Sequence, residues 1–198
     1  MERLVKDVIY SHLVSNNAIT SHQHGFVSHK STQTQLLECT NMWSIWLDEK
    51  EGVDVVYVDV SKAFDTVSHP KLLNKLESYG IKGKILNWVR DFVHARTQAV
   101  RVNSSFSQLL PVSSGVPQGS VLGPLLFLIY INDAVDVSKN CFVKIFADDC
   151  KFYLMTKLLP NYLAFLGSTG LGGGKNPSVS KIGPNSLKMK FFIGFWGR

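Results

Sequence analysis

The chain has 198 residues and a mass of 22.1 kDa, enough for one domain with a sizeable core and a tail. Hydrophobic residues make up 45% and charged residues 18%, which excludes wholesale disorder. The longest apolar run, residues 121–131, is too short for a bilayer and is broken by Gly-Pro, so we expect no membrane partner. Three cysteines without metal-ligand spacing exclude a disulfide scaffold and fit a reducing, intracellular compartment, either nucleus or cytoplasm.

The net charge of +6 suggests an anionic partner, but it is unevenly distributed. Residues 1–150 hold 14 Lys and Arg against 15 Asp and Glu, a net of −1, whereas residues 151–198 hold seven bases and no acid. The second segment also contains 8 of the 15 glycines and shows no sustained hydrophobic period. We therefore expect a folded part over residues 1–157 and a flexible, Gly-rich, basic tail over 158–198.

In chain order, hydrophobic spacing predicts an amphipathic helix over residues 2–15 and a second one from Thr32 that stops at Gly52. Residues 53–60 alternate, with Val56, Val58 and Val60 on one face and Val55, Tyr57 and Asp59 on the other, which indicates a strand. The later expected elements are a helix over 69–79 capped by Ser68, a helix over 84–94, a hairpin of 97–102 with 106–112, a buried helix over 120–132, and strands over 141–146 and 150–155. This order predicts an α+β fold in which helices cover an antiparallel sheet.

Three carboxylates stand out from this pattern. Asp59 is near the end of a strand, while Asp148 and Asp149 occupy a tight turn between two apolar strands. An Asp-Asp turn is most often an ordinary turn in which the side chains bond local amides. In combination, however, a strand-end Asp and a turn Asp on adjacent strands can hold two divalent ions about 3.5–4 Å apart for phosphoryl or nucleotidyl transfer.

Three segments of the chain stand out as motifs: residues 58–67 read VDVSKAFDTV, residues 114–124 read SGVPQGSVLGP, and residues 146–149 read FADD. In this order they resemble motifs A, B and C of the reverse transcriptases of non-LTR, LINE-type and jockey-like retrotransposons. His24-Gly25-Phe26 followed by Ser31-Thr32 is similar to the preceding motif of that group. The resemblance covers about residues 1–157 and implies a polymerase palm with part of the fingers and without the thumb.

The resemblance also implies catalytic roles. Asp59 and Asp148 become ligands of two Mg²⁺ ions, with Mn²⁺ as a substitute, and the Val60 carbonyl becomes a further ligand. Asp149 becomes the third acid of the site. Phe64 occupies the position of the steric gate that excludes a ribose 2′-hydroxyl. Without the flanking acids, Phe64 would be read as an ordinary core aromatic.

The motif B residues Gln118 and Gly119 are expected beside the incoming nucleotide, although turn and helix-entry chemistry explains the same residues equally well. The implied partners are an RNA template, a DNA primer and deoxynucleoside triphosphates. Lys62 and Asp65 are interpreted as local scaffold.

The chain departs from the family pattern at Val27, where an Arg is usual, and carries Lys30 at a second Arg position. It also begins after the basic fingers segment and stops soon after motif C, so we expect weak or absent activity. The rival hypothesis is a non-catalytic, retrotransposon-derived fragment that at most binds nucleic acid. A third class, an RNA-directed RNA polymerase, is disfavoured by Phe64.

Overall fold

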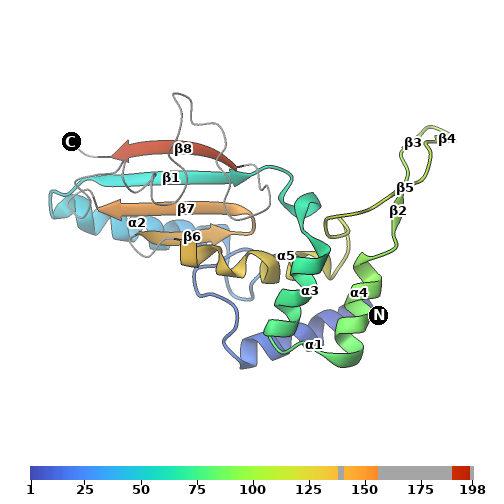
Figure 1. The fold of residues 1–198 in the computed structure, drawn as a ribbon. Helices are drawn as coiled ribbons and strands as arrows, with labels where there is room; N and C mark the ends of the chain where they lie inside the picture. Colours follow the sequence, from blue (N-terminus) through green and yellow to red (C-terminus); the bar gives the residue numbers. More distant parts are fainter. Residues whose placement is uncertain (138–140, 156–188, 197–198) are drawn as a thin grey trace. The chain divides into compact units, whose positions relative to one another are not determined.

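The computed structural model describes residues 1–137, 141–155 and 189–196, which fall into two compact units (Figure 1). The first unit combines residues 1–19 with 62–130, and the second combines 20–61 with 131–198. The units are therefore interleaved along the chain, and residues 62–130 of the first lie between the two parts of the second. Each is described on its own below.

The second unit is built on a four-stranded antiparallel sheet. Its strand order is β6-β7-β1-β8, with β1 spanning Val53–Val60, β6 Phe142–Phe146, β7 Asp149–Met155 and β8 Met189–Trp196 (Figure 1). Val53 of β1 pairs with Met155 of β7, and Val58 pairs with Cys150. One further step along this register sets Asp59 opposite Asp149.

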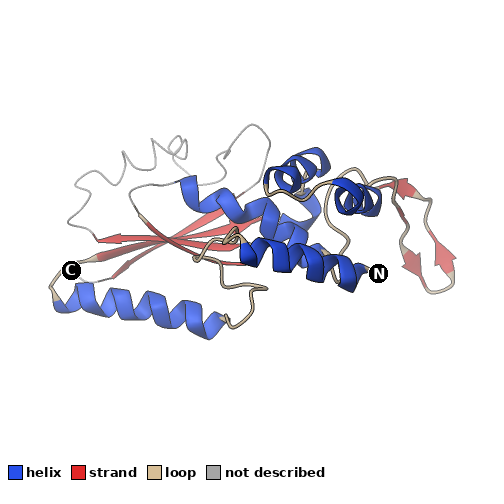
Figure 2. Cartoon of the chain, turned by 90° about the horizontal axis from the view of Figure 1, so that it is seen from below, coloured by secondary structure: helices blue, strands red, loops and turns tan. Residues whose placement is uncertain are grey.

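Helix α2, Thr32–Asp48, runs along one face of this sheet (Figure 2). It begins with a capping box in which the Ser31 hydroxyl accepts from the Thr34 amide and the Thr34 hydroxyl accepts from the Ser31 amide. The side of α2 that faces the sheet packs on β1 and β7 at the end that contains Val53 and Tyr153. The shared core consists of Cys39, Trp46, Val53, Val55 and Tyr153.

The first unit is a helical cluster with a projecting ribbon. Its helices are α1 Glu2–Ser15, α3 His69–Ser78, α4 Gly83–Val93 and α5 Gly123–Ile131, whose last residue falls in the second unit, with a short 3₁₀ turn over Ala63–Thr66. The Glu2 carboxylate accepts from the amides of Val121 and Leu122, so α1 supplies the negative charge that favours the start of α5. The fully buried aliphatic side chains of this unit include Ile9, Leu13, Leu72, Leu76, Leu122 and Leu126.

The expected hairpin is present in a shorter and interrupted form. Strand β2, Thr97–Gln98, pairs with β5, Leu110–Pro111, and β3, Arg101–Val102, pairs with β4, Ser105–Phe106. All eight strand residues are exposed. A two-stranded ribbon without a buried face gains little beyond its hydrogen bonds, which accounts for the short ladders.

The other expected elements match the structure with three differences. The buried helix starts at Gly123, three residues later than expected, because the Ser120 hydroxyl accepts from the Gly123 amide and caps it. Ser68 does precede α3, but its side chain makes no capping hydrogen bond. A 3₁₀ helix over Asn132–Val137 follows α5 and is not expected from the sequence.

Strand β8 corrects the expectation for the tail. The stretch 158–198 shows no strand pattern in the sequence, yet Met189–Trp196 pairs with the whole length of β1. The rest of the tail that we expected to be flexible, residues 158–188 and 197–198, lies outside the described residues. Within the described ranges, no helix has the length and hydropathy that a bilayer crossing requires.

Truncating Trp46 tests the packing that anchors the sheet. The Trp46 ring lies 5.9 Å from that of Tyr153 and 5.3 Å from that of Phe142, centroid to centroid. We expect Trp46→Ala to lower the free energy of unfolding by about 3 kcal/mol or more, because a large buried aromatic leaves a cavity. Urea denaturation measures this loss. The matched control is Leu37→Ala on the same helix, whose side chain is 71% exposed, and an equal loss there would contradict the assignment of the core.

Candidate active site

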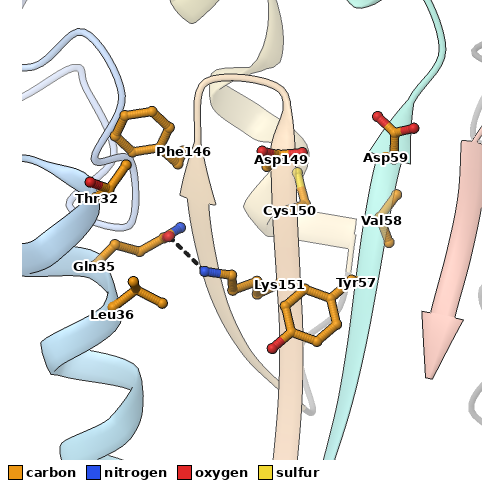
Figure 3. Close-up of a pocket in the computed structure, with 10 residues that line it drawn as sticks. All are labelled: Thr32, Gln35, Leu36, Tyr57, Val58, Asp59, Phe146, Asp149, Cys150 and Lys151. Atoms are coloured by element: carbon orange, nitrogen blue, oxygen red, sulfur yellow. Dashed lines mark hydrogen bonds between the residues drawn. The ribbon is translucent and has the colours of Figure 1, made fainter. Parts of the chain in front are cut away.

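Two aspartates meet at one end of the sheet. Asp59 is the next-to-last residue of β1 and Asp149 is the first of β7, and Figure 3 shows their carboxylates side by side at the same end of these strands. Both line a pocket of about 440 Å³ whose other walls come from α2 and β6. Asp148 is half-buried in the turn between β6 and β7 and does not line this pocket.

The electrostatics show that these carboxyl groups share one region. The pKa of Asp149 lies above its ordinary value because the carboxyl loses hydration against the pocket wall, and next because Asp148 and then Asp59 repel its negative charge. Lys151 opposes this shift without cancelling it. The site therefore holds more negative charge than its protein surroundings neutralise, a condition that a bound cation relieves.

The pocket floor is formed by three contacting side chains. The Lys151 ammonium donates to the Gln35 carbonyl oxygen over 2.9 Å and lies 5.9 Å from the centre of the Tyr57 ring (Figure 3). Gln35 is only 2% exposed, and its amide nitrogen has no hydrogen-bond partner in the part of the chain that is described. The floor thus presents one fixed cation and one buried donor beneath the two carboxylates.

The carboxylates fit a hard divalent cation that is completed by a substrate. Among the described residues, no three His, Cys, Asp or Glu side chains form a closed metal-ligand cluster. Mg²⁺ is typically held by one or two carboxylates together with substrate phosphates, so an open pair suffices. Val60, the last residue of β1, is buried and only 2% exposed.

The turn between β6 and β7 has a partner that the motif comparison does not single out. The Gln23 side chain, 2% exposed, accepts from the Ala147 amide over 2.9 Å and donates to the Ala147 carbonyl over 3.3 Å. A glutamine in a loop gives no sequence signal for such a contact, because the contact spans 124 positions along the chain. Only its place immediately before His24-Gly25-Phe26 hinted at a role.

The remaining candidate residues lie in the first unit, and two of them, Phe64 and Gln118, are held by a defined contact. The Phe64 ring stacks on Phe127, with centroids 4.2 Å apart and an angle of 19° between the planes. The Gln118 amide donates to the Asp65 carboxylate over 2.8 Å. Gly119 has φ +80° and no atom near its missing Cβ, so its glycine is required by the backbone conformation alone.

Motif B is attached to the second half of motif A. The Gly115 amide donates to the Val67 carbonyl over 2.8 Å, and the Val116 amide donates to the Phe64 carbonyl over 2.9 Å. Gly115 has φ +92°, and an added Cβ would lie 2.9 Å from the Asp65 backbone. Asp65 therefore does more than the generic scaffolding expected of it, because it orients Gln118 and receives this close approach.

An α+β fold with paired carboxylates at a strand end and an adjoining turn defines the polymerase palm class, and the sequence comparisons agree. Residues 1–158 match the family described as reverse transcriptase (RNA-dependent DNA polymerase). The chain belongs to this family, as the three motifs indicated. The match covers the whole of the first unit and most of the described part of the second.

The relatives of the chain include non-LTR retrotransposon polymerases of Drosophila melanogaster. The chain is 34% identical over 133 residues to the RNA-directed DNA polymerase from mobile element jockey, and 32% identical over 152 residues to the probable RNA-directed DNA polymerase from transposon X-element. These alignments cover 67% and 75% of this chain. The chain spans only 14% and 17% of the length of these two relatives.

Solved structures support the fold. The chain resembles telomerase from Candida albicans, in a complex with the TWJ fragment of telomeric RNA, with a TM-score of 0.67 at 13% identity. The superposition covers 86% of this chain and 31% of that one. Apo telomerase from Candida tropicalis without its C-terminal domain gives a TM-score of 0.63 at 13% identity over 84% of this chain and 36% of that one. The expected α+β class is thereby confirmed.

The raised pKa of Asp149 predicts a pH-dependent cost to folding. The folded state favours the protonated form of Asp149. The folded state therefore gains stability from this group at pH values below the ordinary pKa of an aspartate, and it loses that gain as the pH rises through the raised pKa of Asp149. We expect Asp149→Asn to melt at a higher temperature than the wild type at pH 7. This gain should vanish near pH 3, where the wild-type carboxyl is itself neutral.

Calorimetry across this pH range measures the effect. Asp91→Asn, at an exposed position of α4, controls for the removal of one negative charge. A gain that is the same at every pH, or that matches the control, would contradict mutual repulsion among the three carboxylates.

Proposed function

We propose that the chain carries the nucleotidyl-transfer site of an RNA-directed DNA polymerase. The observation that carries this proposal is the meeting of Asp59 and Asp149 at one strand end, next to Asp148, in a chain of the reverse transcriptase family. The substrates are deoxynucleoside triphosphates, a DNA primer and an RNA template. The reaction joins the primer 3′-hydroxyl oxygen to the α-phosphorus and releases pyrophosphate.

In this proposal the carboxylates supply the metal ligands. Asp59 and Asp148 hold the divalent ions, with the Val60 carbonyl as a further ligand, and Mg²⁺ or Mn²⁺ fits their hard oxygen donors. Two divalent ions held there would supply Lewis-acid chemistry, lowering the pKa of the primer hydroxyl and offsetting the charge on the leaving pyrophosphate. Asp149 adds negative charge beside the pair, and its repulsion with Asp148 and Asp59 raises the affinity of the site for cations.

The first unit supplies the proposed substrate contacts. The Phe64 ring, fixed by its stacking on Phe127, is the proposed barrier to a ribose 2′-hydroxyl. Gln118, oriented by Asp65, is the proposed contact to the incoming nucleotide. Gly119 leaves open space where a side chain would otherwise meet the substrate. These roles follow from the family resemblance, and the contacts explain why the Phe64 and Gln118 side chains each have one preferred orientation.

Removing Asp148 should abolish DNA synthesis. With an RNA template, a labelled DNA primer and Mg²⁺ or Mn²⁺, we expect weak extension by the wild type and a loss of roughly 100-fold or more in Asp148→Ala, since a metal ligand is removed. Gel analysis of extended primers measures this. Asp91→Asn serves as the surface control and should extend normally. Synthesis that persists in Asp148→Ala, or a wild type no more active than that variant with either ion, would refute the proposed function.

Replacing Phe64 tests the proposed sugar gate. We expect Phe64→Val to incorporate ribonucleotides more readily, lowering the preference for deoxynucleotides by about 10-fold or more, because a smaller side chain removes the collision with the 2′-hydroxyl. Single-nucleotide extension with matched dNTP and rNTP measures the ratio of kcat/KM values. Phe106→Val, on the exposed ribbon, is the control. An unchanged ratio in Phe64→Val would exclude Phe64 as the gate.

A further inference from the structure

The turn that carries two of the three aspartates has an uncommon backbone conformation. Ala147 has φ +54°, in the left-handed region that residues with a Cβ rarely adopt. Asp148 and Asp149 follow immediately, so the conformation of Ala147 sets the direction of both carboxylates. Something outside the turn must hold Ala147 in this conformation.

A neighbouring segment, which we call the strap (residues 20–26), is attached to β6. The His24 amide donates to the Ile145 carbonyl over 2.8 Å, and the Ile145 amide donates to the His22 carbonyl over 2.9 Å. Gln23 thus forms a parallel bridge with Ile145 at the edge of the sheet. The strap is therefore bound to β6 immediately before the turn that contains Ala147.

The Gln23 side chain satisfies both backbone groups of Ala147. Its carbonyl oxygen accepts from the Ala147 amide over 2.9 Å and from the Gly25 amide over 2.7 Å, while its NH₂ group donates to the Ala147 carbonyl over 3.3 Å. Only a primary amide offers an acceptor for two donors and a donor on the same planar group. Both Gln23 and Ala147 are buried, so water is a poor substitute for these contacts.

Gly25 allows the strap to lie this close. A Cβ added to Gly25 would fall 2.3 Å from the Ala147 nitrogen and 2.9 Å from its Cα, distances that backbone atoms cannot accommodate without moving. Position 25 needs glycine because there is no space for a side chain. Its backbone does not have a positive φ, so the conformation alone does not require glycine. Any side chain would push the turn and the strap apart.

Contacts to Lys30 and to α2 also hold the strap in place. Lys30 donates to the carbonyl of Gln23 over 3.0 Å and also to that of Ser21. The His24 ring bonds the Thr34 hydroxyl in α2 over 3.0 Å. The strap is therefore a rigid support for Gln23.

We propose that Gln23 is a positioning residue that clamps the turn at Ala147 and so directs Asp148 and Asp149. The clamp is inferred from the hydrogen bonds of the Gln23 side chain. The expected effect of the clamp on metal binding rests on the proposed function. Gln23 itself contacts neither aspartate in any hydrogen bond of the described residues. It acts on them through the backbone of Ala147.

The test uses the full chain and two readouts that need no catalysis. Gln23→Met keeps the side-chain volume but removes the acceptor and the donor, and Gly25→Ala displaces the strap while keeping Gln23. In both variants we expect hydrogen exchange of the Ala147 amide, measured by NMR, to accelerate about tenfold or more relative to the amides of β1, the effect of losing a buried hydrogen bond. Val53→Ala is the matched control, because it destabilises the same sheet at the opposite end of β1.

The second readout is Mn²⁺ binding, followed by the loss of the free-ion EPR signal and by broadening of the Asp148 and Asp149 amide signals. We expect affinity to fall about tenfold in Gln23→Met and Gly25→Ala, as for other residues that orient metal ligands, and to be unchanged in Val53→Ala. Unchanged Ala147 exchange in both variants overturns the clamp. Faster exchange with wild-type Mn²⁺ affinity overturns the positioning role. If Ala147 exchange is faster in the two variants but the wild type itself binds no Mn²⁺, the clamp is supported and the proposed metal site is overturned.

Discussion

The pairing of β1 with β7 is the constraint on which the site depends. Side chains alternate between the faces of a strand, so a shift of one residue in this register would move Asp59 to the other face and away from Asp149. Val53, Val55 and Tyr153 hold the register, because their burial under α2 would be lost in any shifted arrangement. The apolar end of the two strands thus determines the geometry of the polar end.

This arrangement separates stability from chemistry along the same strands. Trp46 and its neighbours stabilise the sheet at one end, while at the other end lost hydration, and then repulsion from Asp148 and Asp59, raise the pKa of Asp149. A site with unneutralised charge is unfavourable for folding by itself and favourable for binding a cation. The hydrophobic contacts of α2 compensate for that repulsion before any ligand is present.

The sequence allowed much of this to be predicted, for identifiable reasons. Asp59, Asp148 and Asp149 are recognisable because a strand pattern, a tight turn and a fixed motif spacing surround each of them. Gln23 is not, because its partner lies 124 residues away and no local pattern signals a side chain that bonds a distant backbone. Strand β8 is missed for a related reason, since its pairing with β1 is decided by the edge that β1 offers and not by its own alternation.

The interleaving of the two units has a consequence for how the chain folds. Strand β1 ends at residue 60 and its central partner β7 begins at residue 149, so residues 62–130, the larger part of the first unit, lie between two strands that must pair. Closing so long a loop before any contact is gained slows folding. During synthesis, β1 leaves the ribosome well before β7 exists, with a valine-rich edge that can pair with other chains. A chaperone that shields residues 53–60 would therefore act on the step most prone to aggregation.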